Sequence, residues 1–186
     1  MKNFISCIKE YIIVSDELEL AINKVANIKE YTKGDLIVEE GKTCNYLFFT
    51  SEGIVRTYLY QKGKDITHWI YADKSFFTSW HSYILRKPSS EYIEVTTDAK
   101  MILISYDDWQ NLYREFPELE RFGRLLIEEQ IAIIDEFYKG YYFLTAKEKY
   151  ELLTKSFPNI TQIANLGHIA SMLGISQETL SRIRAK

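Results

Sequence analysis

The sequence predicts an α+β protein made of three consecutive parts: a sheet-rich part, one long helix and a small group of helices. Between residues 28 and 104, short apolar runs with a period of two are separated by turns that contain glycine, as in an antiparallel sheet. Residues 117 to about 142 suit a single helix, which would be roughly 39 Å long. The sequence after residue 144 is typical of short helices. The expected divisions are 1–116, 117–144 and 145–186.

Composition excludes several classes of protein. The 186 residues are 46% hydrophobic and 26% charged, which is typical of a folded, water-soluble chain. There is no run of about 18 apolar residues, so a membrane-spanning helix is not expected. The first seven residues also lack the long apolar stretch of a secretion signal. Cys7 and Cys44 stand alone, as thiols do in a reducing compartment, so a cytoplasmic protein is expected.

The net charge is unevenly distributed along the chain. The whole chain carries −3 at pH 7, whereas residues 145–186 hold six Lys or Arg and three Asp or Glu, a local charge of +3. The remaining residues therefore carry −6. A basic part on an acidic body can bind DNA locally while non-specific affinity stays limited. The charge thus neither requires nor excludes a DNA-binding protein.

The expected strands are recognised by their alternation and by the glycines between them. These glycines are Gly34, Gly41, Gly53 and Gly63, and such spacing indicates an antiparallel sandwich or barrel. Residues 71–91 show no strand pattern but contain a group of aromatic residues. In chain order the strand-like runs are Leu36–Val38, Tyr46–Phe49, Ile54–Tyr60, Ile66–Ile70, Tyr92–Thr96 and Lys100–Ile104. The aromatic group consists of Phe76, Phe77, Trp80 and Tyr83.

Capping residues and a proline mark four helix starts. Ser15 precedes an amphipathic stretch that ends near Val25. Ser105 opens a capping box, and Pro117 suits the first position of the long helix. Thr145 opens a second capping box at the expected start of the last part.

The long helix has more apolar surface than one contact requires. A seam at heptad-like spacing is interrupted at Glu129-Gln130, and further apolar residues lie beside it. Such a helix needs burial on two sides. It is either the central core helix of a monomer or a dimerisation helix with its own sheet on one side and a second copy on the other. The seam favours the dimer. It consists of Leu119, Phe122, Leu126, Ile133 and Phe137, and the further residues are Leu125, Ile127, Ile131, Ile134, Tyr138 and Tyr141.

The segment 166–186 predicts two short helices joined by a tight turn. Gly174, after the first helix, can adopt the positive φ that ends a helix sharply. Ser176 can cap the second helix with its hydroxyl. Together they form a helix-turn-helix, with the small Ala170 where the two helices cross. The apolar residues are Leu166, Ile169, Ala170 and Leu173 on the first helix and Leu180 and Ile183 on the second.

The second helix presents polar and basic side chains on its outer face. A helix, a glycine and a helix also form ordinary αα-corners, which is the alternative. Such a corner does not need this concentration of hydrogen-bonding groups and cations. The candidate DNA-binding residues are Ser176, Gln177, Glu178, Thr179, Ser181, Arg182 and Arg184, with Lys186 as a further phosphate contact.

This order of parts resembles the Crp/Fnr family of bacterial transcription regulators over nearly the whole chain, and especially its short members from Bacteroidetes-type bacteria. The resemblance implies a β-roll of the cyclic-nucleotide-binding type, a long dimerisation helix and a winged-helix-like helix-turn-helix domain with a shortened wing. It also implies a homodimer that binds a pseudo-palindromic site in double-stranded DNA. RNA polymerase is a further expected partner, and a small-molecule effector is left open.

The resemblance also implies roles in base reading. In the family, the recognition helix uses an Arg, the Glu next to it and an Arg four residues after that Glu. The last two match Glu178 and Arg182, whereas Gln177 takes the place of the first Arg, so the preferred site is expected to differ at that base. We expect Arg182 to contact a guanine and Glu178 a cytosine amine. The alternative is that Arg182 only holds a phosphate.

The effector region departs from the family. Members that bind cyclic AMP have a Gly-Glu pair and an Arg-Ser pair there. Residues 76–91 contain no Gly-Glu, and Pro88-Ser89 stands roughly in place of Arg-Ser, with Arg86 and Lys87 as nearby cations. A buried cyclic phosphate needs a cation and backbone donors, and proline has no N–H. The roll is therefore not expected to bind cyclic AMP. Its aromatic residues either suit an apolar or flat ligand or fill the roll, and the filled roll is favoured.

No cofactor, metal or enzymatic activity is expected. His68, His81 and His168 lack metal-ligand spacing, and neither a four-cysteine cluster nor a nucleophile–base pair is present. The predicted function is a dimeric, sequence-specific DNA-binding transcription regulator. The alternative is a regulatory ligand- or protein-binding module without a DNA role, whose terminal helices bind a partner protein. Target genes and the direction of regulation stay undetermined.

Overall fold

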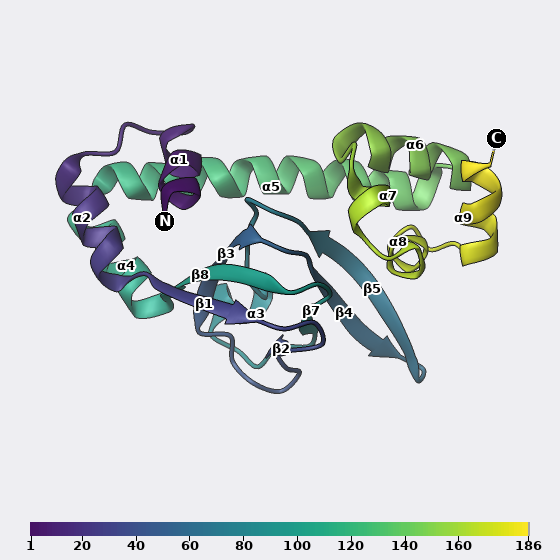
Figure 1. Cartoon of the computed structure of the whole chain (residues 1–186), viewed down its shortest axis with the longest axis horizontal. Helices are drawn as coiled ribbons and strands as arrows, with labels where there is room; N and C mark the ends of the chain where they lie inside the picture. Colours follow the sequence, from purple (N-terminus) through teal and green to yellow (C-terminus); the bar gives the residue numbers. More distant parts are fainter. Residues whose placement is uncertain (186) are drawn as a thin grey trace.

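A computed structural model describes residues 1–185 and shows two antiparallel sheets lying beside one long helix (Figure 1). The sheets have the strand orders β1-β8-β3-β6 and β2-β7-β4-β5, and together they form the β-roll. The strands are β1 (Asn27–Tyr31), β2 (Leu36–Val38), β3 (Tyr46–Glu52), β4 (Val55–Gln61), β5 (Lys64–Tyr71), β6 (Phe76–Phe77), β7 (Tyr92–Val95) and β8 (Ala99–Ser105). The expected α+β fold is confirmed.

The helices lie at the two ends of the roll and along it. Helices α1, α2 and α4 gather near one end of the long helix α5, and α6 to α9 gather near the other (Figure 1). The helices are α1 (Lys2–Lys9), α2 (Asp16–Val25), α3 (Trp80–Leu85), α4 (Tyr106–Glu115), α5 (Pro117–Phe143), α6 (Ala146–Ser156), α7 (Ile160–Ile163), α8 (Leu166–Met172) and α9 (Gln177–Arg184).

Each expected strand-like run lies in a strand, and the ends differ by a few residues. Strands β1 and β6 were not predicted as separate strand-like runs. Strand β1 is almost entirely exposed, so no face of it is marked by apolar residues. Strand β6 has only Phe76 and Phe77, which pair with Phe49 and Phe48 of β3 and are both buried. Neither strand shows the alternation by which a half-buried strand is recognised.

Aromatic rings fill the interior of the roll. The ring of Phe77 stacks on Phe48 at 5.2 Å between centroids and on Tyr71 at 5.1 Å. All three side chains are buried, together with Ile93 and Met101. The expected filled roll is therefore observed, because the space between the sheets is occupied by these side chains.

The helix starts agree with the capping residues. The hydroxyl of Ser15 accepts a hydrogen bond from the Leu18 N–H at 3.2 Å, and that of Ser105 accepts from the Asp108 N–H at 3.1 Å. Thr145 forms the reciprocal capping box with Glu148, and Pro117 is the first residue of α5. These caps satisfy N–H groups that have no partner within the helix.

The heptad-like seam of α5 packs on the chain itself. Leu119, Phe122 and Leu126 are buried in the same core as α1, α2 and α4. Ile133 and Phe137 are half-buried, and the Phe137 ring meets Trp69 of β5 edge-on at 5.2 Å. The seam therefore packs on the chain's own core, and a dimer through α5 stays a prediction. A second apolar face on α5 is exposed instead, with exposed fractions of 60% at Ile131, 50% at Ile134 and 61% at Tyr138.

Candidate nucleic-acid interface

Helices α8 and α9 form the predicted helix-turn-helix. Gly174 between them has φ 66°, in the left-handed region, and the Ile175 N–H closes the turn on the Ala170 carbonyl at 3.0 Å. The Ser176 hydroxyl accepts from the Thr179 N–H at 3.2 Å and so caps α9. The ring of Tyr141, at the end of α5, occupies the space beside Gly174 that a Cβ would fill. In the described residues 144–185 this part is built from α6 to α9 without a strand.

The inner face of the two helices is apolar, as the sequence predicted. Ile169, Ala170 and Leu173 of the first helix and its turn are buried, and so is Leu180 of α9. They pack against Leu153 of α6 in one cluster with α7. Leu166, Ile175 and Ile183 are only partly buried. This core fixes the orientation of α9, since one face of the helix is held and the opposite face is turned outward.

The outer face of α9 carries the candidate residues. Ser176, Gln177, Glu178, Ser181, Arg182 and Arg184 are exposed, and Thr179 is half-buried. The side chains are thus displayed on one continuous polar surface of the helix and its cap. Lys186 lies outside the described residues.

Glu178 is held as an ionised acceptor at the start of α9. A hydrogen bond from its own backbone N–H is the largest cause that lowers its pKa, followed by a hydrogen bond with Ser176 and the charge of Arg182. A carboxylate in the first helical turn also faces the positive end of the helix dipole. Glu178 therefore presents acceptor oxygens only, which can pair with an amine donor.

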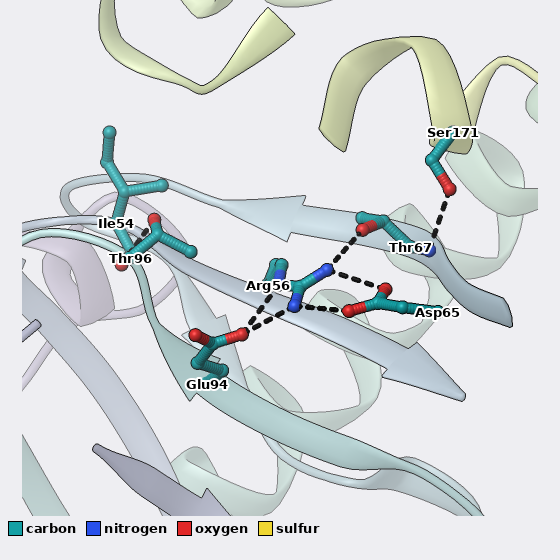
Figure 2. Close-up of polar contacts among 7 residues, drawn as sticks. All are labelled: Ile54, Arg56, Asp65, Thr67, Glu94, Thr96 and Ser171. Carbon is teal, nitrogen blue, oxygen red and sulfur yellow. Dashed lines mark hydrogen bonds and ion pairs between the residues drawn. The ribbon is translucent and has the colours of Figure 1, made fainter. Parts of the chain in front are cut away.

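Helix α8 lies against the β-roll at strand β5. The backbone N–H of Thr67 donates a hydrogen bond of 2.9 Å to the Ser171 hydroxyl (Figure 2). Ile54 and Ile70 of the roll are buried in the same apolar cluster as Ile169 of α8. The helix-turn-helix therefore shares its core with the roll.

The buried Arg56 links neighbouring strands of the β2-β7-β4-β5 sheet near this contact (Figure 2). The Arg56 guanidinium donates from Nη1 and Nη2 to the two carboxylate oxygens of Asp65 at 2.7 and 2.6 Å. It also donates from Nε to Glu94 at 2.8 Å and from Nη1 to the Thr67 hydroxyl at 2.9 Å. Its planar face lies over the Tyr58 ring at 4.1 Å. Because its partners come from β5 and β7, Arg56 ties three neighbouring strands together.

Sequence reasoning missed the Arg56 network. The residue stands inside an apolar run that was recognised only as a strand, and its acidic partners lie 9 and 38 positions away. The one available signal was a cation in the middle of an otherwise apolar and aromatic strand. Such a residue is rarely buried unless it is paired.

His168 of α8 faces the charges of this network. Burial is the largest cause that lowers its pKa, and the positive charge of Arg56 lowers it further, while Glu94 and Asp65 act in the opposite direction. The imidazole is therefore biased toward its neutral form at the contact between α8 and the roll.

Both cations of the effector region, Arg86 and Lys87, are exposed. Arg86, at φ 54°, donates to the carbonyls of Cys44 and Tyr83 at 2.9 and 3.3 Å, and its guanidinium lies over the Tyr106 ring at 4.2 Å. The buried hydroxyl of Ser89 donates to the Glu91 carbonyl at 2.8 Å. These groups are thus engaged with the roll's own backbone.

Two kinds of feature are not found within residues 1–185. No group of three or more His, Cys, Asp or Glu side chains is arranged to hold a metal ion in that range. The helices of the described chain are also too short or too polar to cross a membrane.

Comparison with known proteins agrees with this architecture. The sequence-family model of the cyclic nucleotide-binding domain matches residues 28–116. FixK2 from Bradyrhizobium japonicum has a similar structure, with a TM-score of 0.70 and 17% identity over 87% of this chain and 83% of FixK2. No curated protein matches the chain by sequence.

Two further solved structures have the same arrangement of parts. A CooA mutant from Carboxydothermus hydrogenoformans gives a TM-score of 0.68 and 18% identity over 94% of this chain and 84% of CooA. The other structure is named as a putative transcriptional regulator of the crp/fnr family from Eubacterium rectale. It gives a TM-score of 0.69 and 18% identity over 91% of this chain and 81% of that chain. Residues 28–116 therefore match the cyclic nucleotide-binding domain, and the chain as a whole has the fold of the Crp/Fnr regulators.

Proposed function

We propose that this protein is a homodimeric transcription regulator that binds a pseudo-palindromic DNA site through α9. The observation that carries the proposal is the outer face of α9, which displays polar and basic side chains while Leu180 holds the opposite face in a core. The Crp/Fnr fold supports it. In this proposal residues 1–116 are the sensor, 117–144 the dimerisation helix and hinge, and 145–186 the DNA-binding domain.

The dimer surface in this proposal is the exposed apolar face of α5. The face consists of the half-buried Ile127 and the exposed Ile131, Ile134 and Tyr138. They follow one another at spacings of four, three and four residues, which is the a/d spacing of a coiled coil. The face is flanked by i,i+4 ion pairs, one of which joins Arg124 to Glu128 at 2.7 Å. An exposed apolar stripe of this kind on a helix is typical of a surface that a second helix covers.

Roles on α9 follow from side-chain chemistry. Arg182 can donate two hydrogen bonds to a guanine, and the ionised Glu178 can accept from a cytosine amine. Ser176, Gln177, Thr179 and Ser181 supply shorter polar groups near the start of the helix, and Arg184 near its end suits a phosphate. Two such helices on one face of DNA require half-sites about 34 Å, or 10 bp, apart.

The sensor is proposed to respond to something other than cyclic AMP. The filled interior of the roll and the engagement of Arg86 with backbone carbonyls support this. RNA polymerase is the proposed further partner of a DNA-bound dimer. The rival function is a ligand- or protein-binding module in which α8 and α9 bind another protein.

Selection from a randomised DNA pool tests the function directly. The full chain is expected to enrich a two-fold symmetric site, and a gel shift with that site should show a complex. The matched control is the variant Glu178→Ala/Arg182→Ala, which changes two exposed side chains and should fold as before but lose the enriched site. Failure to enrich any sequence, at a protein concentration where the dimer is present, would favour the rival module.

A further inference from the structure

A cavity of about 820 Å³ lies where the parts of the chain meet. It is lined by α1, by the loops at one end of the roll, by the middle of α5 and by the segment 156–163 of α6 and α7. Among the described residues, none between 77 and 96 lines it, so it is separate from the segment that carries Arg86. Its volume lies within the range of about 300–1,000 Å³ that is typical of small-molecule sites.

The apolar seam of α5 is interrupted where the helix lines the cavity. Leu126 before the interruption and Phe137 after it pack against the chain's own core. Glu129, which is exposed, and Gln130, which is half-buried, lie between them and line the cavity. Glu129 also accepts a hydrogen bond from the hydroxyl of Tyr11, which follows α1. Polar groups at this one turn of a core-facing seam indicate a site that is kept open rather than a defect in packing.

The walls of the cavity are aromatic and aliphatic. Trp69 of β5 and Phe157 of the last part approach each other edge-on at 6.2 Å and both line the cavity. Ile54 and Ile133 add aliphatic surface. Flat aromatic ligands gain most from such walls, because ring faces and edges pack favourably against one another.

The exposed charges at the rim of the cavity disfavour anions. Three of the lining residues are acidic, namely Glu10, Asp73 and Glu129, and one, Lys74, is basic. The local charge is therefore −2, which repels a phosphate or a sulfonate and attracts a cation. Asp73 is held in place by a hydrogen bond of 2.7 Å from the Gly53 N–H.

We propose that this cavity binds a flat aromatic molecule that is uncharged or cationic. The aromatic body lies against Trp69, Phe157 and Ile133, and its polar or cationic group faces Glu129 and Gln130. Because such a ligand touches the roll, α5 and the α6–α7 segment together, it stabilises their relative arrangement by differential contact. The binding site stands by itself, whereas its role as the effector site rests on the proposed DNA-binding function.

Two fluorescent probes with the same ring system test the proposal. N-phenyl-1-naphthylamine is uncharged, and 8-anilino-1-naphthalenesulfonate adds one sulfonate to it. The full chain should bind the uncharged probe saturably at one molecule per chain, with a Kd at least tenfold lower than for the sulfonate. Glu129→Gln should lower the ratio of the sulfonate's Kd to the uncharged probe's Kd severalfold, because it removes one negative charge without a change of size.

Tryptophan substitutions that fill the cavity are compared with a tryptophan substitution outside it. Ile133→Trp and, separately, Gln130→Trp should each raise the Kd of the uncharged probe at least tenfold. Ile84→Trp is the control, since Ile84 is an exposed residue of α3 outside this cavity and should leave binding unchanged. Thermal unfolding of each variant verifies that it folds. If Ile133→Trp does not fold, Gln130→Trp alone tests the effect of filling the cavity.

Two results would overturn the site: equal affinity for the two probes, or binding of the uncharged probe that neither filled variant weakens. Gel shifts with and without the probe then test its effector role separately. Probe binding without any DNA complex refutes the proposed function and leaves the site. A DNA complex without probe binding refutes the cavity as a binding site and leaves the proposed DNA-binding function.

Discussion

The backbone N–H of Thr67 on β5 donates a hydrogen bond of 2.9 Å to the hydroxyl of Ser171 on α8, 104 residues later in the chain. It is a polar contact between the roll and the first helix of the helix-turn-helix. Thr67 is at the same time a hydrogen-bond partner of the buried Arg56 (Figure 2). Thr67 of β5 therefore contacts both the Arg56 network and the helix that packs against α9.

Ser171→Ala should loosen the contact between α8 and β5. It leaves the Thr67 N–H without its acceptor, and a buried donor without a partner costs about 1–3 kcal/mol. Hydrogen exchange of the Thr67 amide, measured by NMR on the full chain without DNA, should become faster. Ser181→Ala changes an exposed serine of α9 and is the control. Unchanged exchange at Thr67 would show that the apolar cluster alone holds α8.

Acidification should weaken the same contact through His168. Its pKa in the folded chain lies below the ordinary value of about 6.5, so protons bind more tightly after α8 leaves the roll. Its contribution to stability is present above about pH 6.5 and is lost as the pH falls toward the folded pKa. The charged groups acting on it are Arg56, Asp65, Glu94 and Lys33.

The measurement is the thermal midpoint of unfolding between pH 7.5 and 5. The midpoint should fall more steeply for the natural chain than for His168→Gln, which cannot be protonated in this range. Comparing the two curves separates His168 from the nearby carboxylates, which both proteins share. Parallel curves would exclude the histidine as a cause.

Ile134→Asp should break the proposed dimer and leave the fold of the chain intact. The side chain is 50% exposed in the single chain, so a charge there costs little until a second copy covers it. Sedimentation should show the monomer at micromolar concentration, with loss of DNA binding. Glu136→Asp, an exposed acidic position on the same helix, is a conservative control. A variant that sediments as a dimer would place the interface elsewhere.

Arg182→Ala should weaken binding to the selected site by about 1–3 kcal/mol and binding to random DNA much less, because a base contact is lost. Arg184→Ala should weaken both about equally and reduce the salt dependence, as expected for a phosphate contact. Fluorescence anisotropy at several salt concentrations measures all four cases. An equal loss on both DNAs for Arg182→Ala would make it a phosphate contact as well.

Cyclic AMP should not bind with useful affinity. The interior of the roll is filled by Phe48, Phe77 and Tyr71, and Arg86 of the loop donates to backbone carbonyls. An anion placed there would be buried without a counter-charge. Isothermal titration with cyclic AMP and cyclic GMP is the test. A Kd near or below about 10 μM, on the order of −7 kcal/mol, would mean that the loop rearranges to supply a cation.

Local signals in the sequence determined most of the elements. Ser15, Ser105 and Thr145 fixed three helix starts, because a capping hydroxyl satisfies N–H groups within its own turn. Gly174 and Ser176 fixed the helix-turn-helix for the same kind of reason. The apolar inner face around Leu180, and hence the outward face of α9, followed from helical periodicity alone.

Only the tertiary structure decided which apolar face of α5 is covered by the chain itself. Both faces carry suitable spacing, so periodicity could not separate Phe122, which is buried, from Ile131, which is exposed. The contact of Ser171 with Thr67 and the cavity beside Glu129 were also decided only by the tertiary structure. Each depends on residues that are far apart in the sequence, and their proximity is set by packing of the whole chain, for which no local rule exists.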